Sequence, residues 1–267
     1  MIIDDASFAL IQSLLEKYAG IALGASKRQM VINRLSGPMR QTGCTSLKNY
    51  LPLVEENKEQ RQVFINALTT NVTSFFREPH HYPVLARHLK GKLSKARIWS
   101  AGCSTGQEPY SILMHLASID AASLTGRNTP LIMATDIDTQ VLAIAKAGIY
   151  DKSNLKGIEP ATIARFFEPV TEQGFRVKAM WRALIDFRPL NLCDVELRAP
   201  REKFDAIFCR NVMIYFGAEQ QRRLTTHLLQ SLAPNGLLFA GHSEMLLHSN
   251  SLFESLGQTV YRENRTR

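Results

Sequence analysis

The stretch of this sequence best suited to chemistry is a short loop bracketed by Gly102 and Gly106. The apolar run 97–101 leads into it, and a helical pattern begins after Pro109. We therefore predict a strand, a tight loop and a helix N-terminus. The two glycines allow a ligand to approach the backbone, and the unpaired N–H groups of the first helical turn favour an anionic or polar group. A nucleotide-like cofactor fits this loop, although an ordinary turn of a buried sheet has the same pattern.

An acidic residue, Asp136, closes the next predicted strand, residues 131–135, and a helix is expected from about Thr139. A dinucleotide fold needs the spacing G-x-G-x-x-G and an acid about 20 residues further on. Here three residues separate Gly102 from Gly106, and Asp136 lies 30 residues after Gly106, which argues against NAD. A carboxylate at a strand end suits a ribose diol, because each oxygen accepts from a hydroxyl. The combination fits the adenosine half of S-adenosylmethionine.

Two further strand ends supply groups suited to an adenine ring. Asn191 and Leu192 follow the strand that ends near residue 189, and Asn211 and Val212 follow the predicted strand 204–209. Amide groups and free backbone groups read the edge of a base, while apolar side chains hold its faces. Each residue alone is ordinary turn chemistry. Because all of them converge on one edge of the sheet, we treat them as candidate ligand contacts.

The elements that must position these residues alternate between strands and helices from residue 97 onward. Further strands are predicted at 236–241, after a helix that stops at 234–236, and at 258–261. This alternation predicts an α/β fold, a mostly parallel, doubly wound sheet whose ligand sits beyond the carboxyl ends of the strands. Residues 149–184 break the rhythm with a short helix at 160–166 and a hairpin, and we predict a small inserted β-subdomain there.

Before residue 97 the sequence has only helical periodicity, which predicts a small N-terminal all-α domain in residues 1–70 and a linker helix in residues 71–95. Residues 96–267 form the predicted sheet domain. Ser46 is a plausible N-cap for the helix that follows it. The front domain carries a basic cluster, in which the first and third residues are seven apart and share a helix face: Lys27, Arg28, Arg34 and Arg40. This is either a solvated face or a docking surface for something acidic.

Composition narrows the class of protein further. The formal charge of +8 favours an acidic partner, which is a nucleic acid, a membrane surface or an acidic protein. No stretch is long and apolar enough to cross a bilayer, so we expect a cytoplasmic protein without direct membrane insertion. The four widely separated cysteines form no metal-ligand spacing and are expected to be buried or loop thiols. The pair His80 and His81 lacks further ligands at helical spacing, so no metal is predicted.

Five motifs in order resemble those of the bacterial chemotaxis receptor glutamate methyltransferases, the CheR family. They cover the chain from residue 70 towards its C-terminus and are long enough to be highly specific, and the helical front domain is similar as well. The motifs are Thr70-Asn71-Val72-Thr73-Ser74-Phe75-Phe76-Arg77-Glu78, Trp99-Ser100-Ala101-Gly102-Cys103-Ser104-Thr105-Gly106-Gln107-Glu108-Pro109-Tyr110-Ser111, Ala134-Thr135-Asp136-Ile137-Asp138-Thr139, Phe208-Cys209-Arg210-Asn211-Val212-Met213-Ile214-Tyr215-Phe216 and Leu238-Phe239-Ala240-Gly241-His242-Ser243-Glu244.

The resemblance implies a Rossmann-like, S-adenosylmethionine-dependent methyltransferase that esterifies glutamate side chains on the cytoplasmic helical bundle of chemoreceptors. The products are glutamyl methyl esters and S-adenosylhomocysteine, and the process is sensory adaptation in chemotaxis. The resemblance also implies the site residues, with Arg77 and Tyr215 nearest the transferred methyl group. The cofactor contacts are Asn71, Thr73, Arg77, Gly102, Glu108, Asp136, Asn191, Leu192, Asn211 and Val212. Gln107 departs from the family, where a second Glu is common, and we expect Glu108 to keep the role.

Such a reaction needs few catalytic groups. A glutamate side chain is ionised at neutral pH, so it is already a nucleophile and needs no general base. The protein must desolvate both reactants and align them, which is catalysis by positioning. Arg77 is expected to orient the carboxylate with its fork of N–H donors and Tyr215 with a hydroxyl. The alternatives are an ion pair of Arg77 with Glu78 or Glu108, and a purely structural ring for Tyr215.

The remaining expectations concern partners. The resemblance implies that the acidic chemoreceptor bundle faces the basic cluster. Some relatives bind a receptor C-terminal peptide through a glycine-rich loop, and here the corresponding turn, residues 169–174, has one glycine, so no obligatory tether is expected. A nucleic-acid methyltransferase stays an alternative, although residues 211–214 lack the Asn/Asp-Pro-Pro-Tyr run of many base methylases. A cofactor-switched adaptor without catalysis is a third possibility.

Overall fold

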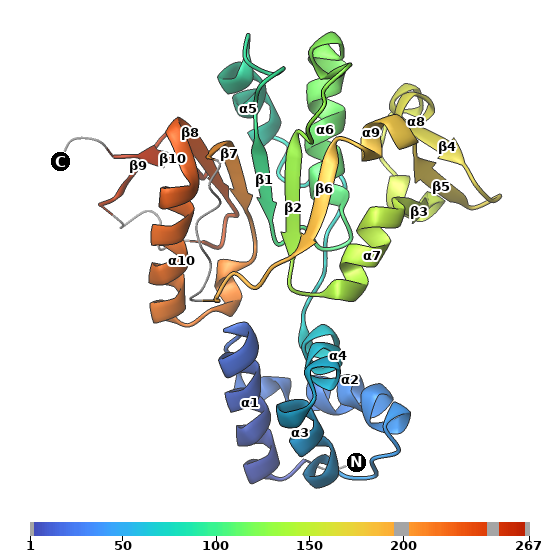
Figure 1. Ribbon diagram of the computed structural model, residues 1–267, viewed down its shortest axis with the longest axis vertical. Helices are drawn as coiled ribbons and strands as arrows, with labels where there is room; N and C mark the ends of the chain where they lie inside the picture. The colour runs from blue at the N-terminus through green and yellow to red at the C-terminus, as the bar shows by residue number, and fades with distance from the viewer. Residues whose placement is uncertain (1–2, 195–202, 245–250, 265–267) are drawn as a thin grey trace.

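The computed structural model describes residues 3–194, 203–244 and 251–264, which form a helical front domain and a larger sheet domain (Figure 1). The front domain holds α1 (Asp5–Ala19), η1 (Ala25–Lys27), α2 (Arg28–Gln41), α3 (Leu47–Glu56) and α4 (Lys58–Leu68). The predicted N-cap is confirmed, because the Ser46 side chain accepts from the backbone N–H of Asn49. These helices bury a core of their own, which includes Leu15, Tyr50 and Phe64. Among the described residues, no helix is long and apolar enough to cross a membrane.

The sheet domain is built on seven strands in the order β6-β2-β1-β7-β8-β10-β9. The first five run parallel, and β10 and β9 are antiparallel to their neighbours. The strands are β1 (Ile98–Ala101), β2 (Ile132–Asp136), β6 (Ile185–Pro189), β7 (Phe204–Cys209), β8 (Leu232–Ala240), β9 (Phe253–Ser255) and β10 (Val260–Glu263). The flanking elements are α5 (His81–Leu89), α6 (Gln107–Asp120), η2 (Ala122–Leu124), α7 (Thr139–Ala147), η4 (Met213–Tyr215) and α10 (Ala218–Ser231). The α/β fold with a mostly parallel sheet is thereby confirmed.

Both faces of the sheet are buried, which explains why its strands read as continuous apolar runs. Alternate residues of one strand enter different cores: Phe208 packs in the core that contains α5 and α6, whereas Ile207 packs in the core that contains α10. The linking helix α5 is part of the first core, where it buries Tyr82 and Leu85. Because it is anchored there, α5 holds the residues before it close to the sheet.

A small antiparallel sheet, in the order β3-β5-β4, lies beside the main one (Figure 1). The hairpin of β4 (Phe167–Pro169) and β5 (Gly174–Val177) confirms the predicted insertion, as does α8 (Pro160–Phe166). The other elements here are β3 (Ile149–Asp151), η3 (Lys152–Leu155) and α9 (Ala179–Arg182). β3 was not predicted, because three residues are too few to carry a readable alternation.

Three predicted boundaries are wrong for backbone reasons. The linker helix predicted over residues 71–95 spans only His81–Leu89, because Phe76 and Glu78 before it have positive φ. The helix before β8 ends at Ser231 rather than at residues 234–236, since Leu232 already pairs with the first residue of β7. The pairing register then shifts, and Asn235 has a φ of 64°, so the turn-like residues mark an irregularity inside the strand. The last predicted strand begins at Val260 instead of residue 258, because the two residues before it have positive φ and cannot be extended.

The front domain is joined to the sheet domain at the carboxyl ends of the parallel strands (Figure 1). On one side the Gln62 amide donates to the carbonyl of Ile137, just after β2, at 2.8 Å. On the other side the backbone N–H of Ala22 donates to the carbonyl of Tyr215, in η4, at 2.8 Å. Hydrogen bonds therefore hold the front domain over the edge where an α/β sheet binds its ligands.

A buried acid, Glu244, ties two strand ends together. Its Oε1 accepts from the backbone N–H of Val212 at 2.9 Å, so the turn after β8 supports the turn after β7. The side chain fits closely, because a Cβ atom on Gly241 would lie 2.4 Å from Oε2 of Glu244. Burial, with a contribution from the Glu78 carboxylate, raises the pKa of Glu244 from 4.5 to about 7.

We expect this raised pKa to appear in the pH dependence of stability. The folded protein holds the Glu244 proton more tightly than the unfolded chain, so the stabilisation is complete below about pH 4.5 and is lost as pH rises through about 7. Relative to Glu244→Gln, the wild-type free energy of unfolding should fall by about 3 kcal/mol across that window. Denaturant unfolding of both proteins at several pH values measures the difference.

The matched control is Glu254→Gln at an exposed ion pair with Arg262. The pKa of Glu254 is lowered by its hydrogen bond from Arg262, so its stabilisation is already complete above the ordinary glutamate range. The difference between wild type and this control should stay flat from about pH 5.5 upward, where this glutamate is ionised in both the folded and the unfolded protein. Parallel profiles for wild type and Glu244→Gln would contradict the shifted titration.

Candidate functional site

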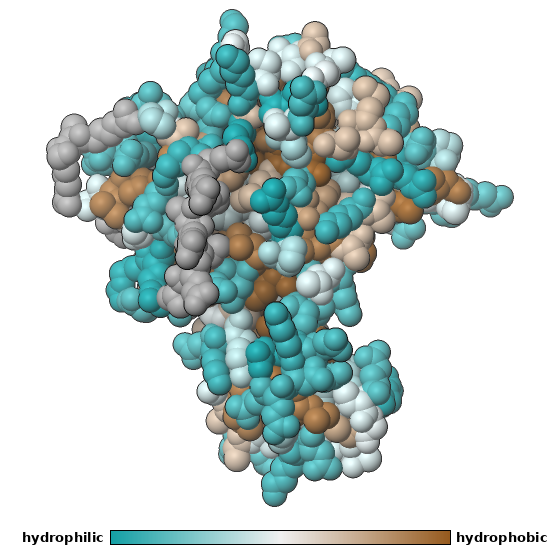
Figure 2. Space-filling view, in the orientation of Figure 1, coloured by the Kyte–Doolittle hydropathy of each residue, from teal (hydrophilic) through white to brown (hydrophobic). Residues whose placement is uncertain are grey.

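A cavity of about 350 Å³ lies between the front domain and the carboxyl ends of the strands. Figure 2 shows apolar surface at this junction, bordered by hydrophilic side chains. The structure brings every predicted cofactor and catalytic residue to the wall of this cavity. They are Asn71, Thr73, Arg77, Gly102, Glu108, Asp136, Asn191, Leu192, Asn211, Val212 and Tyr215.

Part of the wall comes from the front domain, which the sequence pattern linked only to docking. Ala19 and Ile21 contribute from the end of α1, and Leu68 and Thr69 from the end of α4. Helical periodicity gave no signal for this role, because these residues end helices rather than form a polar or apolar stripe. The front domain therefore forms part of the cavity wall, in addition to carrying the predicted docking residues.

The glycine loop has the geometry that close packing requires. Gly102 has a φ of 83°, and its N–H donates to the carbonyl of Thr135 at 2.8 Å. A Cβ atom at Gly102 would lie 2.4 Å from Cγ2 of Val212, so any other residue would clash with the opposite wall. Two residues later, the backbone N–H of Ser104 donates to the Asp136 carboxylate at 2.8 Å. The loop after β1 is thus hydrogen-bonded to Asp136, the acid that ends β2.

Asp136 is held ready to accept further hydrogen bonds. Its Oδ2 accepts from Ser104, and its Oδ1 accepts from the backbone N–H of Asp138 at 2.9 Å. Burial raises the pKa of Asp136, while these two backbone bonds act in the opposite direction. A carboxylate oxygen has two lone-pair directions, so each oxygen keeps one for a ligand. Two adjacent hydroxyl groups are the ligand that such a pair of acceptors suits.

Asp138 is a residue of the site that sequence reasoning missed. Its Oδ1 caps α7 by accepting from Gln140 N–H at 2.9 Å, while its Oδ2 accepts from the Asn71 amide at 2.7 Å and the Thr69 hydroxyl at 2.8 Å. An acid directly before a predicted helix is an N-cap signal, so its capping role was readable from the sequence. Its second role was not, because Asn71 and Thr69 are distant in the chain.

Asn191 uses its side chain within the protein. Its Nδ2 donates to the carbonyl of Tyr18, in α1, at 3.0 Å, and its Oδ1 accepts from the backbone N–H of Cys193 at 3.0 Å. The amide therefore bridges the front domain and the cavity wall.

Asn211, on the opposite wall, has a φ of 58°, a conformation that Asn tolerates better than most residues.

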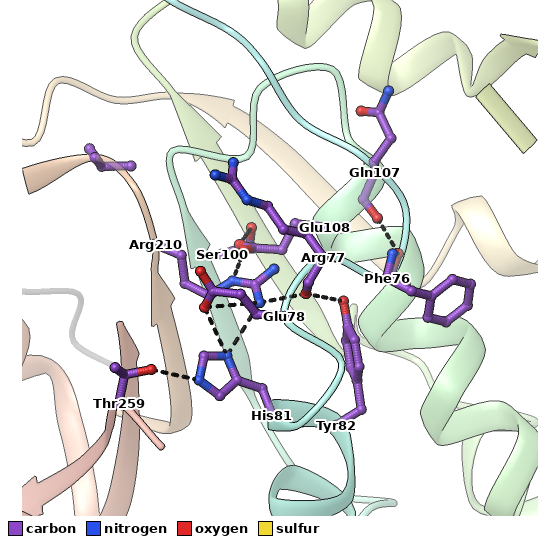
Figure 3. A network of polar contacts seen from close by, with 12 residues as sticks. Phe76, Arg77, Glu78, His81, Tyr82, Ser100, Gln107, Glu108, Arg210 and Thr259 are labelled. Carbon is purple, nitrogen blue, oxygen red and sulfur yellow. Dashed lines mark hydrogen bonds and ion pairs between the residues drawn. The ribbon is translucent and has the colours of Figure 1, made fainter. Parts of the chain in front are cut away.

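The Glu108 carboxylate is buried and paired, but its partner is Arg210. Oε2 of Glu108 accepts from Nε of Arg210 at 2.7 Å, and Oε1 accepts from the Ser100 hydroxyl at 2.7 Å. In the part of the chain that the structure describes, the Arg77 guanidinium donates to the carbonyl of Val72 at 3.4 Å. Figure 3 shows the Arg77 carbonyl directed into the Arg210 network and its guanidinium directed away from it.

Arg210 also lines the cavity. It had no predicted role, although it belongs to the family motif at residues 208–216. It directly follows β7, whose last three residues are fully buried apolar side chains. An arginine at the end of such a strand requires a buried counter-ion, and that requirement was the available signal. Sequence alone does not say which acid provides it, because Glu108 lies about a hundred residues away in the chain.

Tyr215 lies in the short helix η4, and its ring is partly exposed at the cavity wall. It is not among the buried aromatic side chains of the core. Its backbone carbonyl accepts from Ala22, so the front domain fixes the position of the residue. Tyr215 therefore belongs to the cavity wall rather than to the apolar core.

One group of side chains in the described part of the chain has metal-ligand geometry. The ligand atoms of Glu78, His80 and His81 lie within 4.8 Å of one another. Nδ1 of His81, however, is 3.2 Å from Nη1 of Arg210, and that nitrogen is 3.8 Å from the Glu78 carboxylate. A buried guanidinium in that position repels a second cation. Glu78 and His81 are therefore assigned as polar partners of Arg210.

The four predicted docking residues lie on the front domain, away from the cavity wall. Arg28 donates to Asp5 at 2.7 Å and to the carbonyl of Ile3 at 3.0 Å, so it already has internal partners. Arg34 donates to the carbonyl of Thr69. Lys27 and Arg40 are exposed, and Lys27 ends η1 instead of continuing the helix of Arg34. Of the four predicted docking residues, Lys27 and Arg40 are therefore the most accessible to a partner.

Comparisons with known proteins agree with this geometry over almost the whole chain. Residues 6–69 match the family model described as CheR methyltransferase, all-alpha domain, and residues 71–262 match CheR methyltransferase, SAM binding domain. The chemotaxis protein methyltransferase of Escherichia coli K12 is 45% identical over 264 residues, which cover 97% of this chain and 91% of the relative. Chemotaxis protein methyltransferase 2 of Pseudomonas aeruginosa is 41% identical over 261 residues, covering 95% and 91%. This chain belongs to the CheR methyltransferase family.

Proposed function

We propose that this chain transfers the methyl group of S-adenosylmethionine to glutamate side chains on the cytoplasmic helical bundle of chemoreceptors, the methyl-accepting chemotaxis proteins. It would act in the cytoplasm, at receptor arrays reached through its substrate. The observation that carries the proposal is the single cavity into which all the predicted cofactor and catalytic residues converge. The family membership adds the reaction class.

The donor set around the cavity fits S-adenosylmethionine. A cavity of about 350 Å³ is within the range for small-molecule sites, and its wall combines apolar side chains with a few polar groups. The free lone pairs of Asp136 would accept from the ribose hydroxyls, and Leu192 and Val212 would hold the adenine faces. Glu108 would face the positively charged amino group of the methionine part. No metal is required, because the acceptor carboxylate is already ionised and nucleophilic at neutral pH.

The chain's own residues would act by positioning. When bound, S-adenosylmethionine supplies an electrophilic methyl group: a glutamate oxygen bonds to it, the carbon–sulfur bond breaks, and sulfur keeps the electron pair as S-adenosylhomocysteine forms. The Arg77 guanidinium would orient the incoming carboxylate, and the Tyr215 hydroxyl would donate to it. The part of the cavity wall that the front domain forms would exclude water and so strengthen the contacts of Arg77 and Tyr215 with the carboxylate.

The partner proposals follow the same chemistry. An acidic receptor bundle would dock on the exposed cations Lys27 and Arg40, and the positive net charge would favour the encounter. Residues 169–174, which connect β4 to β5, contain one glycine, Gly174 at the start of β5, so we propose that no receptor C-terminal tether is obligatory. A nucleic-acid substrate is the second candidate for the same charge, but the turn after β7 lacks the run typical of many base methylases.

Incubation with methyl-labelled S-adenosylmethionine and receptor cytoplasmic fragments tests the activity. We expect label on the fragment that is released by mild base, because glutamyl methyl esters hydrolyse readily. Replacement of the accepting glutamates by glutamine should abolish the label. Label on RNA would support the nucleic-acid alternative, and binding of the cofactor without any transfer would support the adaptor.

The same assay examines the tether. The receptor fragment is supplied with and without its last residues, at concentrations below saturation. Equal rates are expected if no C-terminal peptide is needed. A rate that collapses with the shortened fragment would contradict this part of the proposal, while leaving the methyl transfer itself established.

Arg77→Ala is expected to lower the turnover number by about 100-fold, because the loss of a group that orients the acceptor misplaces the reacting atoms. Its free energy of unfolding should change by less than about 1 kcal/mol, since Arg77 is partly exposed and its guanidinium makes a long hydrogen bond to the Val72 carbonyl. Tyr215→Phe should slow turnover by about 10-fold through the loss of its hydroxyl donor. Turnover and thermal melting of the purified variants measure both effects.

Arg87→Ala is a suitable control, because Arg87 is an exposed arginine of α5 that lies outside the cavity wall. Its turnover should equal that of the wild type. If Arg77→Ala retained full activity, Arg77 would have no part in the mechanism.

The double variant Lys27→Ala/Arg40→Ala is expected to lower the methylation rate about 10-fold at low salt and subsaturating receptor, because it removes charges that attract the acidic bundle. The difference should shrink as salt is added. Lys90→Ala/Lys95→Ala removes the same charge from exposed positions beyond α5 and serves as the control. Equal losses in both double variants would assign the effect to net charge and remove the docking surface.

A further inference from the structure

Arg210 is a buried cation that connects the two halves of the site. Its Nε donates to Glu108 at 2.7 Å, and its Nη1 donates to the backbone carbonyl of Arg77 at 2.8 Å (Figure 3). Its side chain is 2% exposed. The two bonds leave from different nitrogens of one rigid guanidinium, so they fix the distance and angle between the Glu108 carboxylate and the Arg77 backbone.

The surroundings keep this guanidinium charged and still. Burial alone would lower the pKa of Arg210, but Glu108, Tyr82 and Glu78 together outweigh burial and the pKa is raised. Burial and the Arg210 charge lower the pKa of His81 to about 3, so His81 is neutral. Its Nε2 faces the carbonyl of Gln258 at 3.0 Å and its Nδ1 faces Arg210 at 3.2 Å. A proton on Nε2 satisfies both contacts, because Nδ1 then accepts from the guanidinium.

The turn that carries Arg77 needs such support. Phe76 and Glu78, on either side of it, have φ values of 53° and 52°, in the left-handed region that non-glycine residues avoid. Two ties hold the turn: the Ser111 hydroxyl accepts from Phe76 N–H at 2.9 Å, and the Arg77 carbonyl accepts from Arg210. A strained turn persists only when its surroundings over-determine it.

The Tyr82 hydroxyl adds a longer contact to the same carbonyl, at 3.4 Å. The Arg77 backbone is thus fixed from the buried side, while its guanidinium is directed away from these ties (Figure 3). Any loss of the buried ties would let the strained turn relax and move the guanidinium with it.

We propose that Arg210 is a positioning residue for methyl transfer: it holds the strained turn at residues 76–78 in register with Glu108 and thereby aims the Arg77 guanidinium at the acceptor carboxylate. This inference rests on the proposed function. It assigns Arg210 no contact with the transferred methyl group. Its effect on the reaction passes through Arg77.

Arg210→Lys tests the proposal, because lysine keeps the charge beside Glu108 but has one nitrogen and cannot make both bonds in the same geometry. We expect the turnover number to fall about 30-fold, while affinity for S-adenosylhomocysteine stays within about 3-fold. In an Arg77→Ala background the same substitution should have no further effect on turnover, because the group it positions is absent. Additive losses in this double-mutant cycle would overturn the proposal.

Ser111→Ala releases the second tie of the same turn with a smaller structural change and covers the case in which Arg210→Lys does not fold. It should lower turnover about 5-fold in the wild type and not at all in the Arg77→Ala background, as expected for coupled positions. Arg222→Lys, at an exposed arginine that pairs with Glu219, is the matched control and should leave turnover unchanged.

Crystal structures provide a readout that does not depend on transfer. The backbone of residues 76–78 should have moved in Arg210→Lys or Ser111→Ala, and an unmoved turn would contradict the proposal. Failure of the proposed function is distinct, because it would appear as a wild type that transfers no methyl group to receptor fragments.

Discussion

The buried ion pair between Glu108 and Arg210 is the interaction on which the site depends. It joins the start of α6 to the end of β7, and through the Arg77 carbonyl it reaches the segment before α5. Taking two charges out of water is costly, and loss of one partner of a buried pair costs about 3 to 5 kcal/mol. The protein therefore accepts a cost in stability and, in return, holds a carboxylate and a guanidinium in a fixed relative position at the wall of its cavity.

Around that pair, each wall of the cavity is held by a group from another element. Asp138 links the front-domain side to α7, Glu244 links the ends of β7 and β8, and Asn191 reaches α1. These contacts join residues that are far apart in the chain. The cavity is consequently a product of the whole fold, and the carboxyl edge of the sheet is where the ties meet.

Sequence reasoning was strongest where a local pattern decides the outcome. The strand 204–209, the Ser46 cap and the helix 160–166 were predicted at their observed positions, because periodicity and capping are properties of short segments. The strand-end residues were expected at one edge of the sheet, because parallel strands place their carboxyl ends there, and in the structure they line one cavity.

What sequence reasoning missed depends on partners distant in the chain. Three features arise from tertiary contacts: the pairing of Glu108 with Arg210, the second role of Asp138, and the part of the cavity wall that the front domain forms. The bond from Ala22 to the Tyr215 carbonyl has one more consequence. It is a direct mechanical link between the domain proposed to grip the receptor and the residue proposed to act beside the methyl group, so any tilt of the gripping domain is transmitted to the reaction centre across one peptide-to-peptide contact.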